Sequence, residues 1–396
     1  MAIETRYVFR LSCDLDFVIE NSMSKCDILT HARSQYKKLL PRSSCYRTHA
    51  ENSTHADQVI TRVRISTSGG CEAYPSLTSN ERYKLTIARP AYISGKRTNF
   101  ILLSGDTVWG IIRGLETLNQ LVYTTAGDAF VRGIKIDDSP RFAHRGLHID
   151  TARHFIPVST IIQNLEMMSL NKMNVFHWHI VDDQSFPYES SSFPELSKAG
   201  AFSWNQTYTS RDVKYIIEYA RLRGIRVIVE FDMPGHTSSF GKAYPQLLIS
   251  AIPEFRSSRV ADFTNCTCPM NANSPTTIRF LTLFFTEIAK VFPDAYIHTG
   301  GDEVNYDCCV KNPTLSRYMS FNGPSLTNLT CTFIEQINIL LQDVKKKAIV
   351  WQDAYEMHAN LSSDTIIEVW KDWASADLSY WLNKITYDGY RVIVTG

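Results

Sequence analysis

The sequence predicts an α/β protein in which a small α/β domain, residues 1–139, is followed by a (β/α)8 TIM barrel, residues 140–396. The length of 396 residues suits one large barrel with an extra domain. From residue 140 onward, short apolar runs alternate with amphipathic helical stretches, which is typical of a parallel sheet. These runs are apolar at successive positions, as expected for strands that are buried on both faces.

The predicted first domain combines strands with two helices. A helix is expected over 28–40, and a second helix begins at a cap formed by Asp106 or Thr107. The apolar residues of this second helix recur at helical spacing, at Val108, Ile111, Ile112, Leu115, Leu118 and Val122. Strands are expected at 59–65, 83–87 and 100–103. We find no catalytic constellation in this domain and expect its role to be structural.

Seven apolar runs predict the strands of the barrel. They span 146–149, 175–180, 227–231, 296–298, 348–351, 366–370 and 392–394. Helices are expected between them at 212–223 and 277–291. Seven units in about 250 residues correspond to a barrel with about seven of its eight strands present, and a seven-stranded open sheet is the alternative. Because a barrel that lacks a strand exposes two sheet edges, we expect the chain to be truncated at its C-terminus.

Composition and charge exclude several classes of protein. The 41 Lys and Arg residues balance 40 Asp and Glu residues, so no overall field favours nucleic acid or an anionic membrane. No apolar run approaches the roughly 18 residues that a membrane-spanning helix needs. The hydrophobic fraction of 44% is enough to build a core and excludes disorder as the main character of the chain.

Glycosylation motifs and cysteines favour a secretory route. Asn-x-Ser/Thr sequons begin at Asn52, Asn205, Asn265, Asn328 and Asn360. The nine cysteines do not form the paired C-x-x-C motifs of structural zinc sites, which favours an oxidising compartment. Charged residues within 1–20 break any signal-peptide core, so we expect the true N-terminus to be absent from this chain. Chance sequons and buried reduced cysteines are the alternative.

Polar and aromatic side chains follow six consecutive predicted strands, where barrel enzymes place their active sites. In strand order they are Asp150, Arg153 and His154, then Trp178, His179, Asp182 and Asp183, then Asp232 and His236, then Asp302 and Glu303, and finally Trp351 and Trp370. A single member of this set is more often a turn or core residue. Their recurrence at equivalent positions of six units predicts a functional site.

The residue types at these strand ends predict a site for a sugar. Indole rings stack on the apolar C–H face of a pyranose, and charged groups bind its hydroxyls. Glycosidic cleavage needs a protonated carboxylic acid at the leaving oxygen. Asp302 and Glu303 are adjacent, and neighbouring carboxylates and burial both raise a carboxyl pKa. We therefore expect Glu303 to remain protonated near neutral or acidic pH.

Five long segments carry a family resemblance. They are DTVWGIIRGLETLNQLVY (106–123), RGLHIDTARHFIP (145–157), NVFHWHIVDDQSFPYES (174–190), IEYARLRGIRVIVEFDMPGHT (217–237) and HTGGDEV (298–304). These segments resemble the lysosomal β-N-acetylhexosaminidases of glycoside hydrolase family 20. The resemblance covers nearly the whole chain, and the long motifs are highly specific.

The resemblance implies a retaining exo-hydrolase that removes terminal non-reducing β-linked N-acetylglucosamine or N-acetylgalactosamine. In this family the 2-acetamido oxygen of the substrate attacks the anomeric carbon, so no enzyme nucleophile, cofactor or metal is expected. By motif match, Glu303 is the general acid and then the base, and Asp302 holds and polarises the acetamido N–H. Arg153 is expected to bind ring hydroxyls, and Trp351 and Trp370 to wall the pocket.

The same match assigns a supporting group. Asp182 and His236 complete the expected substrate-binding set, and with His179 they form the polar shell that sets the orientation and pKa of Glu303. The implied partners are glycans, glycoproteins or glycolipids that end in N-acetylhexosamine, and a second subunit in a homo- or heterodimer. Neither nucleic acid nor a membrane span is expected. The implied localisation is lysosomal or secreted.

The resemblance also concerns disulfides and the missing strand. A bridge between Cys26 and Cys71 fits the first domain of the family, and Cys308 fits one half of a second bridge, with Cys266 or Cys268 as its partner. Relatives continue past the end of this chain with a Tyr, a Trp and further polar residues that grip the sugar. The chain as given is therefore expected to be inactive or poorly folded.

Two rival functions remain open at this stage. The sequence His177-Trp178-His179 places two imidazoles on one side of a strand, which is an arrangement that can bind the zinc ion of a hydrolase. Amidohydrolase-type sites place this pattern on the first strand, whereas here it lies on the second. The other rival is a non-catalytic carbohydrate-binding protein on the same barrel.

Overall fold

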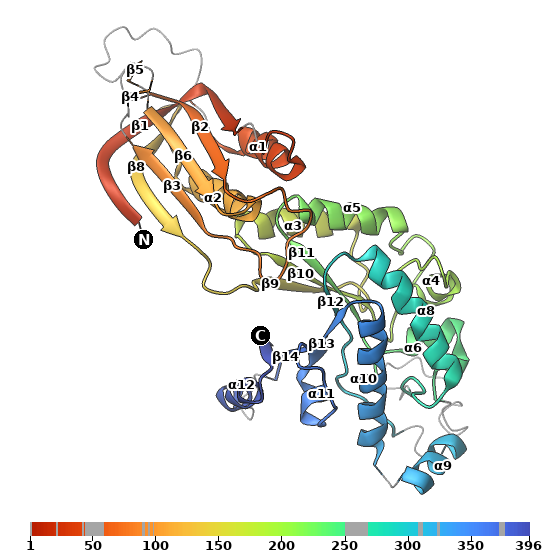
Figure 1. Ribbon diagram of the computed structural model, residues 1–396. Helices are drawn as coiled ribbons and strands as arrows, with labels where there is room; N and C mark the ends of the chain where they lie inside the picture. Colours follow the sequence, from red (N-terminus) through yellow and green to blue (C-terminus); the bar gives the residue numbers. More distant parts are fainter. Residues whose placement is uncertain are drawn as a thin grey trace. The chain divides into compact units, whose positions relative to one another are not determined.

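The computed structural model describes residues 2–20, 23–41, 43, 59–88, 92–93, 96–97, 99–249, 268–307, 312–322, 325–371 and 377–396. The chain forms two compact units, which are traced in Figure 1. Unit 1 comprises residues 1–145, 165–174 and 218–226, and unit 2 comprises residues 146–164, 175–217 and 227–396. The domain boundary between residues 139 and 140 stays a prediction.

Unit 1 is built around one mixed sheet. Its strands are β1 (Ala2–Ile19), β2 (Val59–Thr67), β3 (Tyr83–Ala88), β6 (Asn99–Gly105), β7 (Tyr123–Thr125) and β8 (Asp128–Asp138). They follow the order β1-β2-β6-β3-β8-β7, and β1 also pairs with β8, so five of the strands close into a small barrel-like ring. A separate pair is formed by β4 (Tyr92–Ile93) and β5 (Lys96–Arg97). The three predicted strands of this domain are confirmed.

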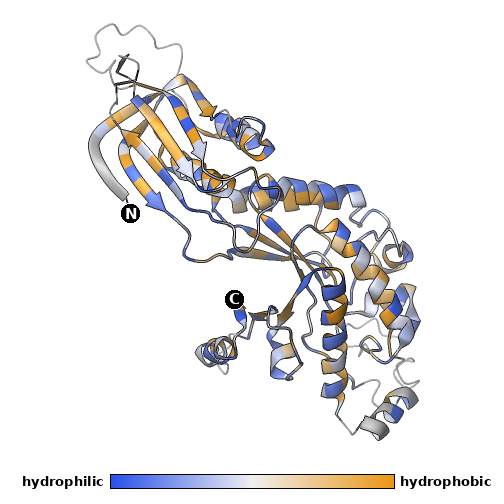
Figure 2. Cartoon of the chain, viewed as in Figure 1, coloured by the Kyte–Doolittle hydropathy of each residue, from blue (hydrophilic) through white to orange (hydrophobic). Residues whose placement is uncertain are grey.

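Two helices bury their apolar faces in the core of unit 1. They are α1 (Asp27–Leu39) and α2 (Val108–Leu121), and both predicted helices are thereby confirmed. Thr107 is the cap of α2, because its side chain accepts a hydrogen bond from the backbone N–H of Gly110 at 3.3 Å. Figure 2 shows hydrophobic residues interspersed with hydrophilic ones along the strands of this sheet, as expected where one face is buried.

Unit 2 contains a seven-stranded parallel sheet. Its strands are β9 (Gly146–Asp150), β10 (Val175–Val181), β11 (Arg226–Phe231), β12 (Tyr296–His298), β13 (Lys347–Trp351), β14 (Ile366–Val369) and β15 (Arg391–Val394). Each strand lies beside the next one in the chain, in the order β15-β14-β13-β12-β11-β10-β9. This order lacks the reversal of an open doubly wound sheet and is that of a TIM barrel, with seven strands present. The predicted fold class is confirmed.

Helices connect the parallel strands. They are α3 (Val158–Leu170), α4 (Glu195–Gly200), α5 (Ser210–Arg221), α6 (Ser238–Ala243), the short 3-10 helix η4 (Pro245–Leu247), α8 (Pro275–Val291), α9 (Pro313–Asn322), α10 (Leu326–Asp343), α11 (Gln352–Glu356) and α12 (Leu378–Tyr387). The helices predicted at 212–223 and 277–291 are confirmed, with small shifts at their ends. No helix among the described residues is long and apolar enough to cross a membrane.

The strand register aligns the carboxyl ends that carry polar residues. His179 on β10 lies opposite Asp150 on β9, and Trp351 on β13 lies opposite Glu368 on β14. Glu230 on β11 lies opposite His298 on β12. Parallel strands in register bring side chains of the same level together inside a barrel, so these residues form one layer.

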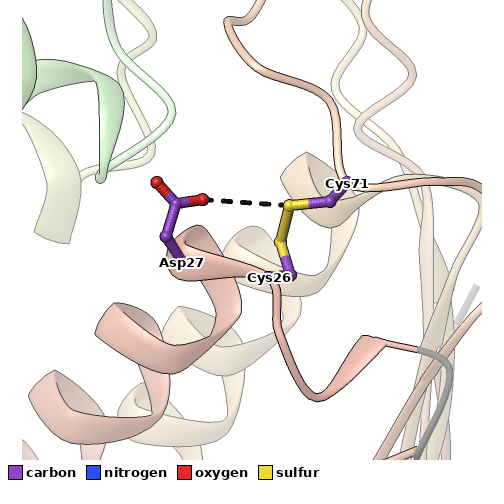
Figure 3. Close-up of side chains that lie close together, drawn as sticks. All are labelled: Cys26, Asp27 and Cys71. Atoms are coloured by element: carbon purple, nitrogen blue, oxygen red, sulfur yellow. Dashed lines mark hydrogen bonds between the residues drawn. A yellow bond between two sulfur atoms is a disulfide. The ribbon is translucent and has the colours of Figure 1, made fainter.

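One disulfide of unit 1 has both of its cysteines among the described residues. Cys26 and Cys71 are joined, as the resemblance implied, and Asp27 lies beside the pair with Oδ1 3.8 Å from the sulfur of Cys71 (Figure 3). The sulfur of a disulfide has no proton, so this contact is not a hydrogen bond. Cys266 and Cys308 lie outside the described residues, and the second predicted bridge stays a prediction.

Replacing both Cys26 and Cys71 by Ser should lower the free energy of unfolding of unit 1 by about 4 kcal/mol. The bridge closes a loop of 45 residues and thereby restricts the unfolded chain. Urea unfolding of the variant and the parent, followed by tryptophan fluorescence, measures the difference. An unchanged unfolding midpoint would show that the bridge does not form or does not matter.

Candidate active site

Arg153 is held at the end of β9 by two carboxylates. Its Nη1 lies 2.7 Å from Asp150 Oδ2 and its Nη2 lies 2.9 Å from Asp182 Oδ2. Asp150 also accepts hydrogen bonds from the backbone N–H groups of Ala152 and Arg153, both at 2.9 Å. The guanidinium is thus fixed in orientation while 42% of the side chain remains exposed. The guanidinium is therefore available to bind a polar ligand at the carboxyl ends of the parallel strands.

His179, Asp182 and His236 form a contact chain behind the arginine. His179 Nε2 lies 2.9 Å from Asp182 Oδ2, and His236 Nδ1 lies 3.3 Å from Asp182 Oδ1. Burial alone would raise the pKa of Asp182, but hydrogen bonds from His179 and His236 outweigh it and hold that pKa well below its usual range. Asp182 is therefore an anion that links two imidazoles.

Asp302 and Glu303 follow β12, and His236 faces both. The His236 Nε2 atom lies 3.6 Å from Asp302 Oδ2 and 3.5 Å from Glu303 Oε2. Burial alone would lower the pKa of His236, but the charge of Asp232 and the other facing carboxylates raise it far above its usual value. His236 is therefore an imidazolium that stands between Asp182 and the adjacent acids.

The two adjacent acids differ in environment, and one sequence-based expectation is wrong here. Burial raises the pKa of Asp302, whose side chain is 13% exposed. The pKa of Glu303 is lowered instead, first by its contact with His236 Nε2 at 3.5 Å, and its side chain is 58% exposed. We expected the neighbouring carboxylate and burial to raise the pKa of Glu303, but the facing imidazolium is the stronger influence in the ligand-free chain.

A glycine turn shapes the approach to Asp302. Gly300 has φ +68°, and a Cβ atom there would lie 1.6 Å from Asp232 Oδ1. The backbone N–H of Gly301 donates to the same Asp232 oxygen at 3.1 Å. Only glycine allows this close approach, which seats the turn on a buried carboxylate. Glu303 itself has φ +50°, an uncommon conformation for a non-glycine residue that often marks a functional position.

The two predicted tryptophans lie at the ends of β13 and β14. Trp351 is buried, its Nε1 donates to Glu230 Oε1 at 2.8 Å, and its ring centroid lies 4.6 Å from that of His298. Trp370 is partly buried, and its Nε1 donates to Asp353 Oδ2 at 2.8 Å rather than to a member of the acid and histidine group. Trp351 is therefore tied to the interior layer, and Trp370 to the loop that follows β13.

Sequence reasoning missed the carboxylates inside the strands. Glu230 on β11 and Glu368 on β14 are buried, and each faces imidazoles. The signal was a single acidic residue within an otherwise apolar strand, at 227–231 and at 366–370. A buried carboxylate of this kind needs a charged or hydrogen-bonding partner, which would have pointed to the histidines of neighbouring strands.

Among the described residues, His177 belongs to two groups of His and Glu side chains close enough to share a metal ion, but its shortest contact is that of an ion pair. His177 Nε2 lies 2.8 Å from Glu230 Oε2, which is a hydrogen-bond distance, whereas two ligands of one tetrahedral zinc stand roughly 3.3 Å apart. Burial would lower the pKa of His177, but the charges of Glu368 and Glu230 outweigh it and raise the pKa to about 9. A metal ion would therefore have to displace this proton, because it binds only the neutral imidazole.

Comparisons with known proteins define the family. The model of glycosyl hydrolase family 20, catalytic domain, matches residues 142–396, and a second model, beta-acetyl hexosaminidase like, matches residues 6–121. The beta-hexosaminidase subunit beta of Homo sapiens is 41% identical over 378 residues, which are 93% of this chain and 64% of that protein. The subunit beta of Mus musculus is 43% identical over 84% of this chain and 59% of that protein.

Solved structures show the same fold. The chitobiase of Flavobacterium johnsoniae has a TM-score of 0.79 at 24% identity and covers 100% of this chain and 58% of its own. An exo β-N-acetylglucosaminidase of Vibrio harveyi, solved with N-acetylglucosamine, has a TM-score of 0.76 at 22% identity over 100% of this chain and 59% of its own. The fold is thus that of the barrel glycoside hydrolases. The chain belongs to glycosyl hydrolase family 20. It spans about three fifths of the length of these first relatives.

Gly300→Ala should disrupt the site more than Gly301→Ala. Both positions have positive φ, so either alanine costs about 1–3 kcal/mol of stability through backbone strain. Only the alanine at 300 also collides with Asp232, because the Cβ at 301 has 3.5 Å of space to its nearest neighbours. Thermal unfolding of the two variants should therefore show the lower melting temperature for Gly300→Ala. Equal melting temperatures would contradict the close packing of Gly300 against Asp232.

Proposed function

We propose that the protein is a retaining exo-β-N-acetylhexosaminidase. It removes terminal non-reducing β-linked N-acetylglucosamine or N-acetylgalactosamine, and the 2-acetamido oxygen of the substrate is the nucleophile. One observation carries the proposal: Asp302 and Glu303 stand side by side at the end of β12 and face a common imidazolium, His236, in a barrel of family 20. The subunit names of the relatives and the solved complex with N-acetylglucosamine support the substrate class.

Glu303 is the general acid and then the base in this proposal. It is half-exposed and ionised in the free chain, where His236 stabilises its charge. A sugar bound over it would remove water from the carboxylate, and desolvation raises a carboxyl pKa. The same side chain can then hold a proton for the leaving oxygen and later take one from the attacking water.

Asp302 is suited to accept the acetamido N–H. Burial raises the pKa of Asp302 and also the pKa of the fully buried Asp232, whose carboxylate lies beside it. The charge of His236, whose Nε2 lies 3.6 Å from Asp302 Oδ2, opposes this effect of burial and favours the anion of Asp302. Asp302 is then left as an acceptor that can orient the acetamido group and stabilise the positive charge that develops on it.

The remaining residues bind and shape the substrate in this proposal. Arg153, fixed by Asp150 and Asp182, binds ring hydroxyls, as planar donors in fixed positions do well. Trp351 and Trp370 offer aromatic faces for the pyranose and its acetamido methyl group. Hydrolysis in this scheme needs no nucleophile from the protein, because the substrate supplies its own.

We also propose a secretory destination and a dimer. Of the five sequon asparagines, Asn205, Asn328 and Asn360 are exposed in the structure, as glycan attachment requires, and the other two lie outside the described residues. The Cys26–Cys71 bridge fits an oxidising compartment. Lysosomal or secreted localisation, and association with a second subunit, follow from the relatives and are proposals for this chain.

Glu303→Gln should lower the turnover number by about two to four powers of ten and change the substrate affinity little. The amide cannot donate or accept the catalytic proton but keeps the size of the side chain. Asp302→Asn should lower turnover too. Both variants are expressed from the complete coding region and assayed with a chromogenic N-acetylglucosaminide, with Glu195→Gln, an exposed glutamate paired with Lys198, as the matched control. Sugar binding without hydrolysis in the parent and in Glu303→Gln alike would identify a non-catalytic binding protein.

Replacing the 2-acetamido group of the substrate by hydroxyl should abolish cleavage. The plain glucoside lacks the oxygen that attacks the anomeric carbon, and the enzyme offers no nucleophile in its place. Parallel assays of the chromogenic glucoside and its N-acetyl counterpart measure the ratio of kcat/KM. Equal cleavage of both substrates would refute substrate assistance while leaving hydrolysis intact.

A further inference from the structure

Glu230 is a fully buried carboxylate that faces side chains from several strands. Its oxygens lie near four imidazoles and one indole: His177 Nε2 at 2.8 Å, His179 Nδ1 at 2.8 Å, His298 Nδ1 at 3.3 Å, His148 Nε2 at 3.6 Å and Trp351 Nε1 at 2.8 Å. A charge so deeply buried is tolerated only where opposite charge and hydrogen bonds surround it. Glu230 is therefore the centre of the polar layer inside the barrel.

A continuous chain of carboxylates and imidazoles leads from Glu230 to the candidate acid. His179 contacts Glu230 through Nδ1 at 2.8 Å and Asp182 through Nε2 at 2.9 Å. His236 contacts Asp182 through Nδ1 at 3.3 Å and approaches Glu303 through Nε2 at 3.5 Å. Anions and imidazoles alternate at every step of this path.

The geometry of His179 fixes its charge. Each of its two nitrogens faces a carboxylate oxygen at hydrogen-bond distance, and a neutral imidazole has only one N–H to donate. Because the pKa values of Asp182 and Glu230 are both lowered and both groups are anions, only the imidazolium satisfies both contacts. Burial would lower the pKa of His179, but the charge of Glu230 and the hydrogen bond to Asp182 outweigh it and raise that pKa well above its usual value.

We propose that Glu230 is a positioning residue for the general acid: it holds His179 as an imidazolium, and thereby fixes Asp182 and the imidazole of His236 that faces Glu303. This inference rests on the proposed role of Glu303. Glu230 does not touch the substrate in this scheme. It acts through His179, much as outer carboxylates orient the histidines of other catalytic sites.

Other charged groups determine which imidazole responds to Glu230. The charged and titratable groups that face this path come from several strands and the segments after them. They are His148, Asp150 and Arg153 of β9 and its loop, His177 and Asp183 of β10 and its loop, Asp232 after β11, His298 and Asp302 of the β12 segment, and Glu368 of β14. Glu368 lies 3.7 Å from His177 Nδ1, and the charge of Glu368 remains when Glu230 is neutralised. His179 then keeps only Asp182 as a contacting anion, so its charge should respond more strongly.

Glu230→Gln tests the proposal because it removes the charge and keeps the shape. The amide N–H can donate to a neutral His179, so the fold has a substitute hydrogen bond. The pKa of His179 should fall, which ¹⁵N NMR of labelled histidines measures on the ring nitrogens across a pH series. The turnover number should fall about 10- to 100-fold with little change in KM. The alkaline limb of the pH–rate profile should move to lower pH, because the imidazolium is lost earlier.

Two further variants separate positioning from a merely structural role. Glu230→Asp keeps the charge and should keep His179 protonated and the position of the alkaline limb, even if turnover falls. Glu287→Gln is the matched control. Glu287 is a buried glutamate of unit 2 that accepts hydrogen bonds from Tyr188 and Ser190, and it does not belong to the path of carboxylates and imidazoles between Glu230 and Glu303. It should leave the charge of His179 and the pH profile unchanged.

Several outcomes would overturn the inference. A neutral His179 at pH 7 in the parent protein, or the same His179 pKa and alkaline limb in the parent and in Glu230→Gln, contradicts it. If Glu230→Gln does not fold, the protonation state of His179 in the parent and in Glu230→Asp still tests the inference, because both proteins should carry the imidazolium at pH 7. Failure of the proposed function is distinguishable, because it would appear as full turnover in Glu303→Gln while the NMR result for His179 stands on its own.

Discussion

The site depends on pairing buried carboxylates with imidazoles at the carboxyl ends of the parallel strands. Asp182 lies between His179 and His236, and His236 in turn faces Asp302 and Glu303. Asp182, His179 and His236 are largely taken out of water, so each is stable only while its neighbours keep the opposite charge. The group is therefore ordered as a unit, and the imidazole that faces Glu303 is connected through Asp182 to His179 inside the sheet.

Much of the fold could be predicted from the sequence because the strands of unit 2 leave a strong local pattern. The strands of unit 2 are buried on both faces and read as short apolar runs, and all seven lie where those runs predicted them. The first domain was harder to predict. In β1 the buried Phe9, Leu11, Leu15 and Phe17 alternate with polar residues, and the charged positions hid an 18-residue strand. Its pairing with both β2 and β8 is a long-range contact that no local pattern carries.

The residues of the candidate site could be named from the sequence, and their roles stay predictions, but their electrostatics could not be predicted. Strand-end position and motif match pointed to Arg153, Asp302 and Glu303, and the structure brings carboxylates and His236 around them. The lowered pKa of Glu303 could not be predicted from its neighbour in sequence, because the nearest influence is an imidazole 67 positions away in the chain. Glu230 was missed for a related reason, since its partners lie on other strands and become adjacent only in the sheet.

The central claim is that Glu303 transfers a proton to the leaving oxygen while the acetamido group of the substrate closes on its own anomeric carbon. Two displacements at the same carbon, first by the acetamido oxygen and then by water, restore the original configuration. Proton NMR of the earliest product formed from a β-linked N-acetylglucosaminide reads that configuration directly. The account predicts that the β anomer of N-acetylglucosamine appears first and then mutarotates. Initial release of the α anomer, or release of no sugar by the protein expressed from its complete coding region, would contradict it.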